Sequence, residues 1–201
     1  MTEQINIRPA TKNDAPIIAK LMLESSGGII EYLVTDLMPG MSPLKIMQWA
    51  VSGKSIPDSY LHTTIYEQDD EVVGITHGYP GSYNKVPSQA DKSPVPFEKL
   101  DYILTPLYRI QLENSWFINT IAVTAQHHDS DLKKLLLDNV KQSAQEQGYD
   151  SVYRYVWADN IKAIELFQSE GYKVVENIDI KRQDLLPHDG GMVLQQLLIN
   201  K

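Results

Sequence analysis

Apolar residues follow two different spacings in the first half of the chain, and the spacing separates helices from strands. In 17–22 they recur as on one face of a helix, whereas 60–67 and 71–79 are rich in β-branched and aromatic residues. The polar residues 68–70 between these two segments are typical of a hairpin turn. We therefore expect strands at 5–8, 60–67 and 71–79 and helices at 15–23, 29–37 and 43–52.

The second half of the chain alternates between strand and helix. Residues 115–124 are almost continuously apolar, as in a central strand covered on both faces, and an amphipathic helix over 132–144 ends at Gly148. This order, inside a sheet otherwise built from hairpins, predicts a mixed α+β fold. The remaining elements are expected as strands at 152–157, 173–180 and 192–199 and a helix at 160–170.

A long connection, 80–114, separates the two halves. A short helix is expected within it, near 96–104 or 106–112. Connections of this length commonly cover a functional site or are partly disordered. The connection holds five of the eleven prolines: Pro80, Pro87, Pro94, Pro96 and Pro106.

Composition narrows the class of protein. A chain of 201 residues with 42% apolar and 22% charged residues suits one domain, 1–201, with a buried core. The absence of cysteine excludes disulfides, zinc–thiolate sites and a thiol nucleophile. A net charge of −8 without a dense Lys/Arg stripe argues against nucleic acid or an anionic membrane as the partner, and it suits an amine-bearing small substrate. Because the amino terminus is not of signal type and no apolar stretch approaches the roughly 20 residues that span a bilayer, we expect a cytoplasmic protein.

Four pieces of the sequence, in order, resemble the superfamily of GCN5-related N-acetyltransferases (GNAT). Residues 7–15 resemble its opening strand and first helix, 116–123 its central strand, and 135–136 part of the helix that follows. The most specific piece is 160–172, NIKAIELFQSEGY, which matches the family pattern N-x-x-A-x-x-x-[Y/F]-x-x-x-G-[F/Y]. The resemblance covers essentially the whole chain.

The resemblance implies a central, mostly antiparallel sheet of about seven strands, flanked by four or five helices. Its parallel neighbours, 116–124 and 152–157, would part near Val123 and Tyr155. Acetyl-CoA, as co-substrate, would enter the gap as a substitute strand and bond to free amides and carbonyls of Ile121 and Val123. Its pyrophosphate would lie at the next helix start, where unpaired N–H groups favour an anion. The implied cofactor-binding residues are Ile121, Ala122, Val123, His128, Asp129, Ser130, Asp131, Leu132, Lys133, Asn160, Ala163 and Phe167.

The segment 128–133, HDSDLK, departs from the family's phosphate loop, [R/Q]-x-x-G-x-[G/A]. Asp131 and Lys133 replace the two small residues. Two unit charges about 5 Å apart at an effective dielectric near 20 repel by roughly 3 kcal/mol, so Asp131 opposes phosphate and Lys133 offsets part of that repulsion. Alternatively, Asp129, Ser130 and Asp131 cap the helix, and a native carboxylate fills the anion site.

The candidate catalytic residues are Tyr155 and Asn119. Phe167 stands where the family usually has a tyrosine that acts as general acid, and a phenyl ring cannot give a proton. Tyr155 could shuttle a proton only if its pKa fell well below about 10; alternatively, Tyr153 and Tyr155 are aromatics that fill a sheet face. Asn119 lies where a carboxylate could have served as base.

Glu24, Glu31 and Tyr32, beside the helix break at 25–28, are candidates for holding the acceptor amine. The alternative is that they form a solvated helix end. A metal is not expected, because the adjacent histidines of 127–129 do not converge as ligands at i and i+4 would.

Two functions remain open at this point. The first is an acetyl-CoA-dependent N-acetyltransferase that acts on a small amine by direct transfer, with no covalent enzyme intermediate. The second is a catalytically degenerate GNAT-fold module that binds a ligand or partner or serves for dimerisation. Asp131 and Phe167 are the residues that discriminate between them, and a homodimer remains open in either case.

Overall fold

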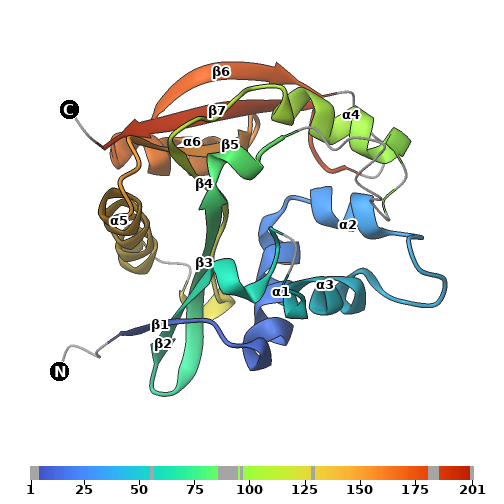
Figure 1. Cartoon of the computed structure of the whole chain (residues 1–201), viewed down its shortest axis with the longest axis horizontal. Helices are drawn as coiled ribbons and strands as arrows, with labels where there is room; N and C mark the ends of the chain where they lie inside the picture. The colour runs from blue at the N-terminus through green and yellow to red at the C-terminus, as the bar shows by residue number, and fades with distance from the viewer. Residues whose placement is uncertain are drawn as a thin grey trace.

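The computed structural model describes residues 5–54, 57–85, 95, 97–127, 130–180 and 186–199. Within these residues seven strands form one sheet in the order β1-β2-β3-β4-β5-β7-β6, and only β4 and β5 pair in parallel (Figure 1). The predicted α+β fold with a mostly antiparallel sheet is therefore confirmed. The strands are β1 Asn6–Pro9, β2 Thr63–Gln68, β3 Glu71–Pro80, β4 Ser115–Val123, β5 Ser151–Trp157, β6 Lys173–Asp179 and β7 Gly191–Leu198.

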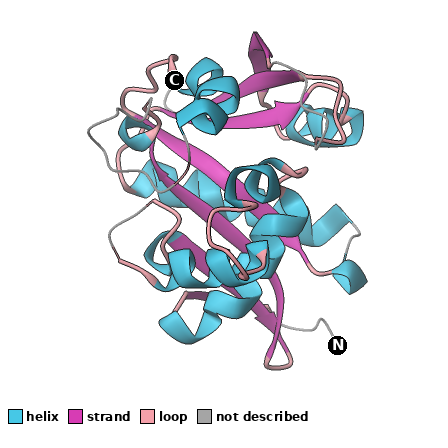
Figure 2. Cartoon of the chain, turned by 90° about the vertical axis from the view of Figure 1, so that its right-hand side faces the viewer, coloured by secondary structure: helices cyan, strands magenta, loops and turns pink. Residues whose placement is uncertain are grey.

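Helices cover both faces of this twisted sheet (Figure 2). The described residues hold six α-helices, where the resemblance implied four or five, and the sixth is the helix expected in the proline-rich connection, which runs through Pro106. None of the helices in this part of the chain combines the length and apolar character needed to cross a membrane. The helices are α1 Ala15–Ser25, α2 Ile29–Val34, α3 Pro43–Ser52, α4 Phe97–Tyr108, α5 Ser130–Glu146 and α6 Ile161–Ser169.

The hairpin between β2 and β3 forms as its polar turn predicts. Asp69 and Asp70 have φ angles of 51° and 63°. Two consecutive residues with positive φ form the type of turn whose twist matches that of the flanking strands, and aspartate tolerates this conformation better than most residues. Gln68 and Glu71 pair directly across the turn.

The two faces of the sheet carry different helices. Helices α1 and α3 pack over Ile65 and Ile75, whereas α5 packs on the opposite face through Leu136, against Tyr66 and Val73 (Figure 1). The neighbours Ile65 and Tyr66 face opposite sides because side chains alternate along a strand. Val73 and Ile75 do so because a bulge in β3 leaves Val73 between the pairs Glu67–Val72 and Tyr66–Gly74. Each face therefore has its own buried core, and a gap in the sheet connects the two sides.

A β-bulge interrupts β4 at Asn119. His77 of β3 pairs with Thr120, but the next residue, Gly78, pairs with Ile118, which leaves Asn119 without a partner in β3. An extra residue of this kind bends its strand and increases the local twist. Gly78 permits the close approach of the two strands, because a Cβ there would lie 2.8 Å from the carbonyl oxygen of Phe117.

The parallel pair β4–β5 separates early. Its register runs from Ser115 opposite Ser151 to Phe117 opposite Tyr153 and then ends, two residues before the bulge. The strands therefore part as predicted, but at Phe117 and Tyr153 and not near Val123 and Tyr155. The bulge accounts for the difference, because it turns β4 away from β5.

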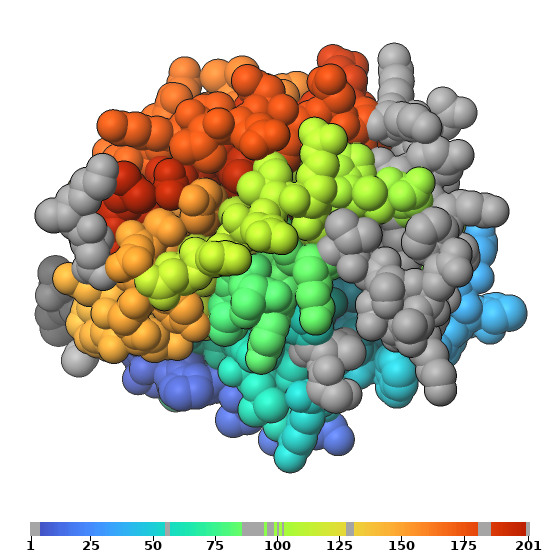
Figure 3. Space-filling view, turned by 45° about the horizontal axis from the view of Figure 1, so that its top comes forward, coloured from blue at the N-terminus to red at the C-terminus, as the bar shows by residue number. Residues whose placement is uncertain are grey.

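Helix α4 is fastened to α2 by Lys99. The Lys99 ammonium donates hydrogen bonds to the carbonyl oxygens of Tyr32, at 3.0 Å, and Thr35, at 2.8 Å, and lies 5.4 Å from the centre of the Tyr32 ring. The last carbonyls of a helix need partners from outside it, so a cation at the end of α2 is a favourable cap. In the space-filling view the yellow-green segment, which includes α4, lies between the green segment that follows β3 and the orange and red carboxyl-terminal segment (Figure 3).

Candidate active site

The gap between β4 and β5 opens into a cavity of about 690 Å³, here called the large cavity. One wall is the free edge of β4, and the opposite wall is α6. The ends of α1 and α5 close it at the sides. Its lining residues are Leu21, Glu24, Ser25, Gly27, Ile121, Ala122, Val123, Ala125, Lys133, Leu137, Arg154, Trp157, Asn160, Lys162, Ala163, Leu166, Phe167 and His188.

The free edge of β4 presents backbone hydrogen-bonding groups. The amide of Thr124 donates to the carbonyl oxygen of Val73 at 2.9 Å, so this pair is hydrogen-bonded across β3 and β4. Hydrogen-bonded and non-hydrogen-bonded pairs alternate in an antiparallel ladder. The N–H and C=O groups of Ile121 and Val123 therefore point away from β3, toward the side that β5 has left.

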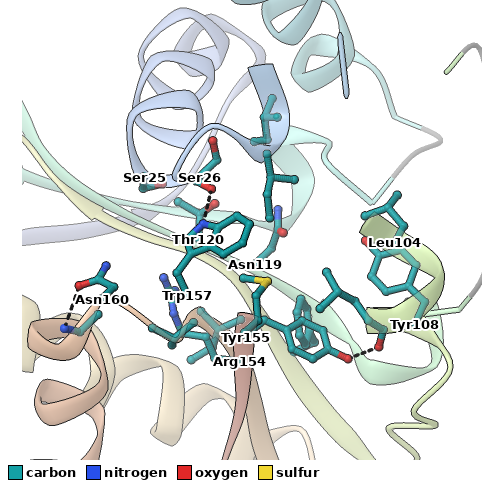
Figure 4. A pocket seen from close by; sticks show the side chains of 18 residues that line it. Ser25, Ser26, Leu104, Tyr108, Asn119, Thr120, Arg154, Tyr155, Trp157 and Asn160 are labelled. Carbon is teal, nitrogen blue, oxygen red and sulfur yellow. Dashed lines mark hydrogen bonds between the residues drawn. The ribbon is translucent and has the colours of Figure 1, made fainter. Parts of the chain in front are cut away.

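A second cavity of about 130 Å³, here called the small cavity, lies beside the first (Figure 4). Helices α2 and α4 form its outer wall, and β4 and β5 form its floor. Five residues line both cavities: Ser25, Arg154, Trp157, Asn160 and Ala163. The remaining lining residues are Ser26, Ile29, Ile30, Leu104, Leu107, Tyr108, Phe117, Ile118, Asn119, Thr120, Tyr155, Val156 and Met192.

Tyr155 lies in the floor of the small cavity, with its hydroxyl engaged. The hydroxyl donates to the carbonyl oxygen of Leu107 and accepts from the Asn84 amide at 3.3 Å. Burial raises the pKa of Tyr155 to about 12. A proton shuttle near neutral pH requires a pKa well below 10, and the pKa of Tyr155 is shifted the other way. The structure therefore favours the alternative, in which Tyr155 packs as a buried aromatic.

Asn119 joins a polar cluster beneath the small cavity. His77 Nε2 lies 3.0 Å from the Pro57 carbonyl oxygen, which can only accept, so this nitrogen carries the proton. His77 Nδ1 therefore accepts from the Asn119 amide, at 3.2 Å, and the same amide lies 3.5 Å from the Asp58 carboxylate. The structure thus brings a carboxylate close to the place where one was sought, and burial raises its pKa. Asp58 was missed because its segment has the pattern of a turn.

Buried, neutral His77 makes the fold sensitive to acid. Burial lowers the pKa of His77 from 6.5 to about 3, so the unfolded chain binds one more proton than the folded chain between these values. The free energy of unfolding should therefore fall by about 1.4 kcal/mol for each pH unit below 6.5 from this group. Denaturant unfolding at pH 7, 6, 5 and 4.5 should show a smaller decline for His77→Gln than for the wild type. Equal declines would contradict the prediction.

Trp157, which lines both cavities, stacks on His188, which lines the large cavity. The ring centres lie 4.2 Å apart, 15° from parallel, and His188 Nδ1 is 2.7 Å from the Asp159 carboxylate. The Trp157 indole donates to the Ser26 carbonyl oxygen at 3.4 Å, and Gly27 packs against both rings. Nothing in the sequence around His188 indicated more than a turn, since its partners come from distant segments.

Helix α6 brings together the predicted residues Asn160, Ala163 and Phe167. The Asn160 side chain caps the helix, accepting from the Ala163 amide at 3.2 Å, and Phe167 is buried with its edge toward Tyr172. Of the twelve predicted cofactor-binding residues, the following line the large cavity: Ile121, Ala122, Val123, Lys133, Asn160, Ala163 and Phe167.

Two of the predicted cofactor-binding residues whose side chains the structure describes lie outside that lining. Asp131 and Leu132 lie in the first turn of α5, with Asp131 exposed. His128 and Asp129 lie outside the described residues, and the side chain of Ser130 is likewise not described.

The predicted acceptor residues are not brought together. Glu24 lines the large cavity, Glu31 is exposed on α2, and Tyr32 is buried in the core beneath α4. The cause is the turn at Gly27 and Gly28, whose φ angles of 61° and 87° redirect the chain between the two helices.

Metal-binding chemistry finds no support in the described part of the chain. No group of three histidine, aspartate or glutamate side chains converges there. His127 instead contacts the hydroxyl of Thr124, its Nδ1 lying 3.0 Å away.

Comparison with known proteins places the fold. No family model matches the sequence, and no curated protein matches it. Among solved structures, an acetyltransferase shares 22% identity over 97% of this chain and 100% of its own, with a TM-score of 0.67. An N-acetyltransferase from Staphylococcus aureus Mu50 shares 19% over 96% and 100%, with a TM-score of 0.70. The yncA protein from Salmonella typhimurium, solved with its cofactor acetyl-CoA, shares 15% over 98% and 95%, with a TM-score of 0.57. At these identities the likeness establishes the fold and not the reaction.

Proposed function

We propose that this chain, which has the fold of the GCN5-related N-acetyltransferases, transfers an acetyl group from acetyl-CoA to a small amine. The observation that carries the proposal is the parting of β4 and β5 at Phe117 and Tyr153, which leaves a free strand edge along a cavity. That cavity shares five lining residues with a second, smaller one. A donor on one side can therefore meet an acceptor on the other.

The large cavity suits the donor in shape and in chemistry. A pantetheine arm is an extended chain with amide groups, and it can pair with the free backbone groups of Ile121 and Val123 as an added strand would. Lys133 brings a cation to the wall, two residues beyond Asp131. A volume of about 690 Å³ lies in the range of cavities that hold a small-molecule ligand.

The small cavity suits a slender acceptor. Its volume of about 130 Å³ corresponds to a few water molecules, since each occupies about 30 Å³ in the liquid. Asn119 and Tyr108 supply polar groups on one side of a lining that mixes polar and apolar residues. Holding the amine against the thioester converts an encounter in solution into a reaction between neighbours, which contributes much of the rate in transfers of this kind.

The alternative is a degenerate module that binds a ligand or partner or serves for dimerisation, and only its dimerisation form allows the gap to be filled by native side chains. Phe167 supports that alternative because it has no proton to give. The open cavity between β4 and α6 favours the enzyme over the dimerisation form, because a plugged gap would leave no room for a thioester.

Thermal melting tests the proposal directly. A ligand present at 100 times its dissociation constant stabilises the folded state by about 2.7 kcal/mol, so millimolar acetyl-CoA should raise the melting temperature by several degrees. ATP, which has the nucleotide but not the pantetheine arm, is the control. A panel of small primary amines with acetyl-CoA should then yield acetylated products by mass spectrometry. The absence of both the shift and any product would refute the proposal.

The charge of Asp131 should weaken coenzyme A binding only modestly. Because this side chain is exposed, water and salt screen it, and the effect falls well short of the hundredfold that an unscreened pair would give. Asp131→Asn should tighten binding about threefold, and the gain should shrink at 0.5 M salt. Calorimetric titration with coenzyme A measures both values. A gain of fiftyfold or more would show instead that the carboxylate directly faces phosphate.

A further inference from the structure

Arg154 is a half-buried cation without an ion pair among the described residues. Its Nε and Nη1 atoms are shielded from solvent and make no hydrogen bond. Arg8 provides the contrast, since its guanidinium contacts the carboxylates of Asp14, at 2.9 Å, and Glu67, at 2.5 Å. Leaving the polar atoms of a buried charge unsatisfied is costly, so such a group calls for a functional explanation.

The position of Arg154 is the junction of the two cavities. It lies on β5 one residue beyond the last pair with β4, and it lines both the large and the small cavity. Its guanidinium stacks over the Phe167 ring, 4.9 Å from the ring centre. Figure 4 shows Arg154 among the labelled residues between Asn160 and Tyr155. Arg154 is the charged residue among the five that line both cavities.

The charge of Arg154 persists at neutral pH. Burial lowers the pKa of Arg154 from 12.5 to about 10, which leaves the guanidinium protonated. The hydroxyl of Tyr172, beside it, also has no hydrogen-bond partner. A guanidinium that stays charged is a poor proton donor, but it compensates a negative charge well in a water-poor site.

We propose that Arg154 is a catalytic residue that stabilises the thiolate released from coenzyme A during acetyl transfer. The inference rests on the proposed function. The amine nitrogen forms a bond to the thioester carbonyl carbon, and the carbon–sulfur bond breaks with its electron pair going to sulfur. The proton lost by the nitrogen passes to water, and the thiolate later takes a proton from water. Phe167 holds the guanidinium by stacking, which removes the need for an acid at that position.

Binding measurements with coenzyme A and desulfo-coenzyme A, which lacks the sulfur, test this role without relying on activity. A nearby cation lowers the pKa of the bound thiol, so the preference for coenzyme A should rise about tenfold between pH 7 and pH 9. Arg154→Gln should abolish this rise, and Arg154→Lys should retain part of it. Lys162→Gln, which removes another cation from the wall of the large cavity, should leave the rise intact.

Turnover gives a second readout. Arg154→Gln should lower kcat for acetyl transfer by about a hundredfold or more with little change in KM for acetyl-CoA, since the thiolate charge develops only as the bond breaks. Melting curves of each variant establish that it is folded.

The possible outcomes separate the two proposals. One outcome is that coenzyme A and desulfo-coenzyme A both bind to the wild type with a preference that does not change with pH. This result would overturn the role of Arg154 and leave the proposed function standing. If neither binds, the proposed function itself fails. If Arg154→Gln specifically weakens succinyl-CoA and leaves the preference unchanged, the cation holds an acyl carboxylate, which also overturns the role.

Discussion

Replacing Ala163 by tryptophan should weaken acetyl-CoA binding by at least a hundredfold. Ala163 lines both cavities, so an indole at this position occupies the space that the proposed thioester needs. A hundredfold loss of affinity corresponds to about 2.7 kcal/mol of binding free energy. Forcing part of a ligand out of its cavity should cost at least this much. Calorimetric titration with acetyl-CoA gives the affinity, and melting shows whether the helix has survived.

Gln168→Trp is the matched control for this variant. Gln168 lies on the same helix, is exposed, and lines neither cavity. The control should bind acetyl-CoA within about twofold of the wild type, since surface substitutions away from a site are usually neutral. If Ala163→Trp binds as well as this control, the ligand does not occupy the gap between β4 and α6.

Gly27→Ala should disrupt both the fold and the activity. Gly27 has a φ of 61°, and a Cβ added there would lie 2.3 Å from the Trp157 Nε1 and 2.6 Å from the His188 Nε2. The substitution combines backbone strain with displacement of the Trp157–His188 stack. We expect a loss of about 2–4 kcal/mol in the free energy of unfolding, and at least a tenfold loss of activity in the protein that remains folded.

Gly40→Ala separates strain from collision. Gly40 has a similar φ of 78°, but nothing lies within 4 Å of an added Cβ. It should cost only about 1–2 kcal/mol and leave the activity unchanged, because only the backbone penalty remains. Denaturant unfolding of both variants measures the difference. If the two variants lose equal amounts of stability and activity, displacing the Trp157–His188 stack has no effect of its own.

Patterns along the sequence predicted the helices and strands well, but they predicted the contacts between these elements poorly. The hairpin at Asp69 and Asp70 and the helix that begins at Pro43 follow from local spacing and turn chemistry, so they could be found without the fold. The parting of β4 and β5 came from family resemblance. Its cause, the bulge at Asn119, has no glycine or proline to mark it and depends on pairing with a strand some 40 residues away.

The candidate site was predicted only where it follows the backbone. Ile121 and Val123 occupy the free edge because strand order places them there. Arg154 was overlooked because a single arginine in a strand has the pattern of a solvent-facing residue, and no sequence pattern reveals that a counter-ion is missing. Glu24 and Glu31 were grouped by proximity along the chain, but the turn between them separates them.

The hydrogen bonds of Lys99 set a threshold for larger acceptors. Through that one ammonium, α2 and α4 act as a single wall of the small cavity, although the two helices are far apart in sequence. A proposed acceptor amine too bulky for the cavity must force the two helices apart and break both bonds, and hydrogen bonds to a charged group contribute about 1.5–3 kcal/mol each. We therefore expect this contact to discriminate among the proposed acceptors by size without touching them.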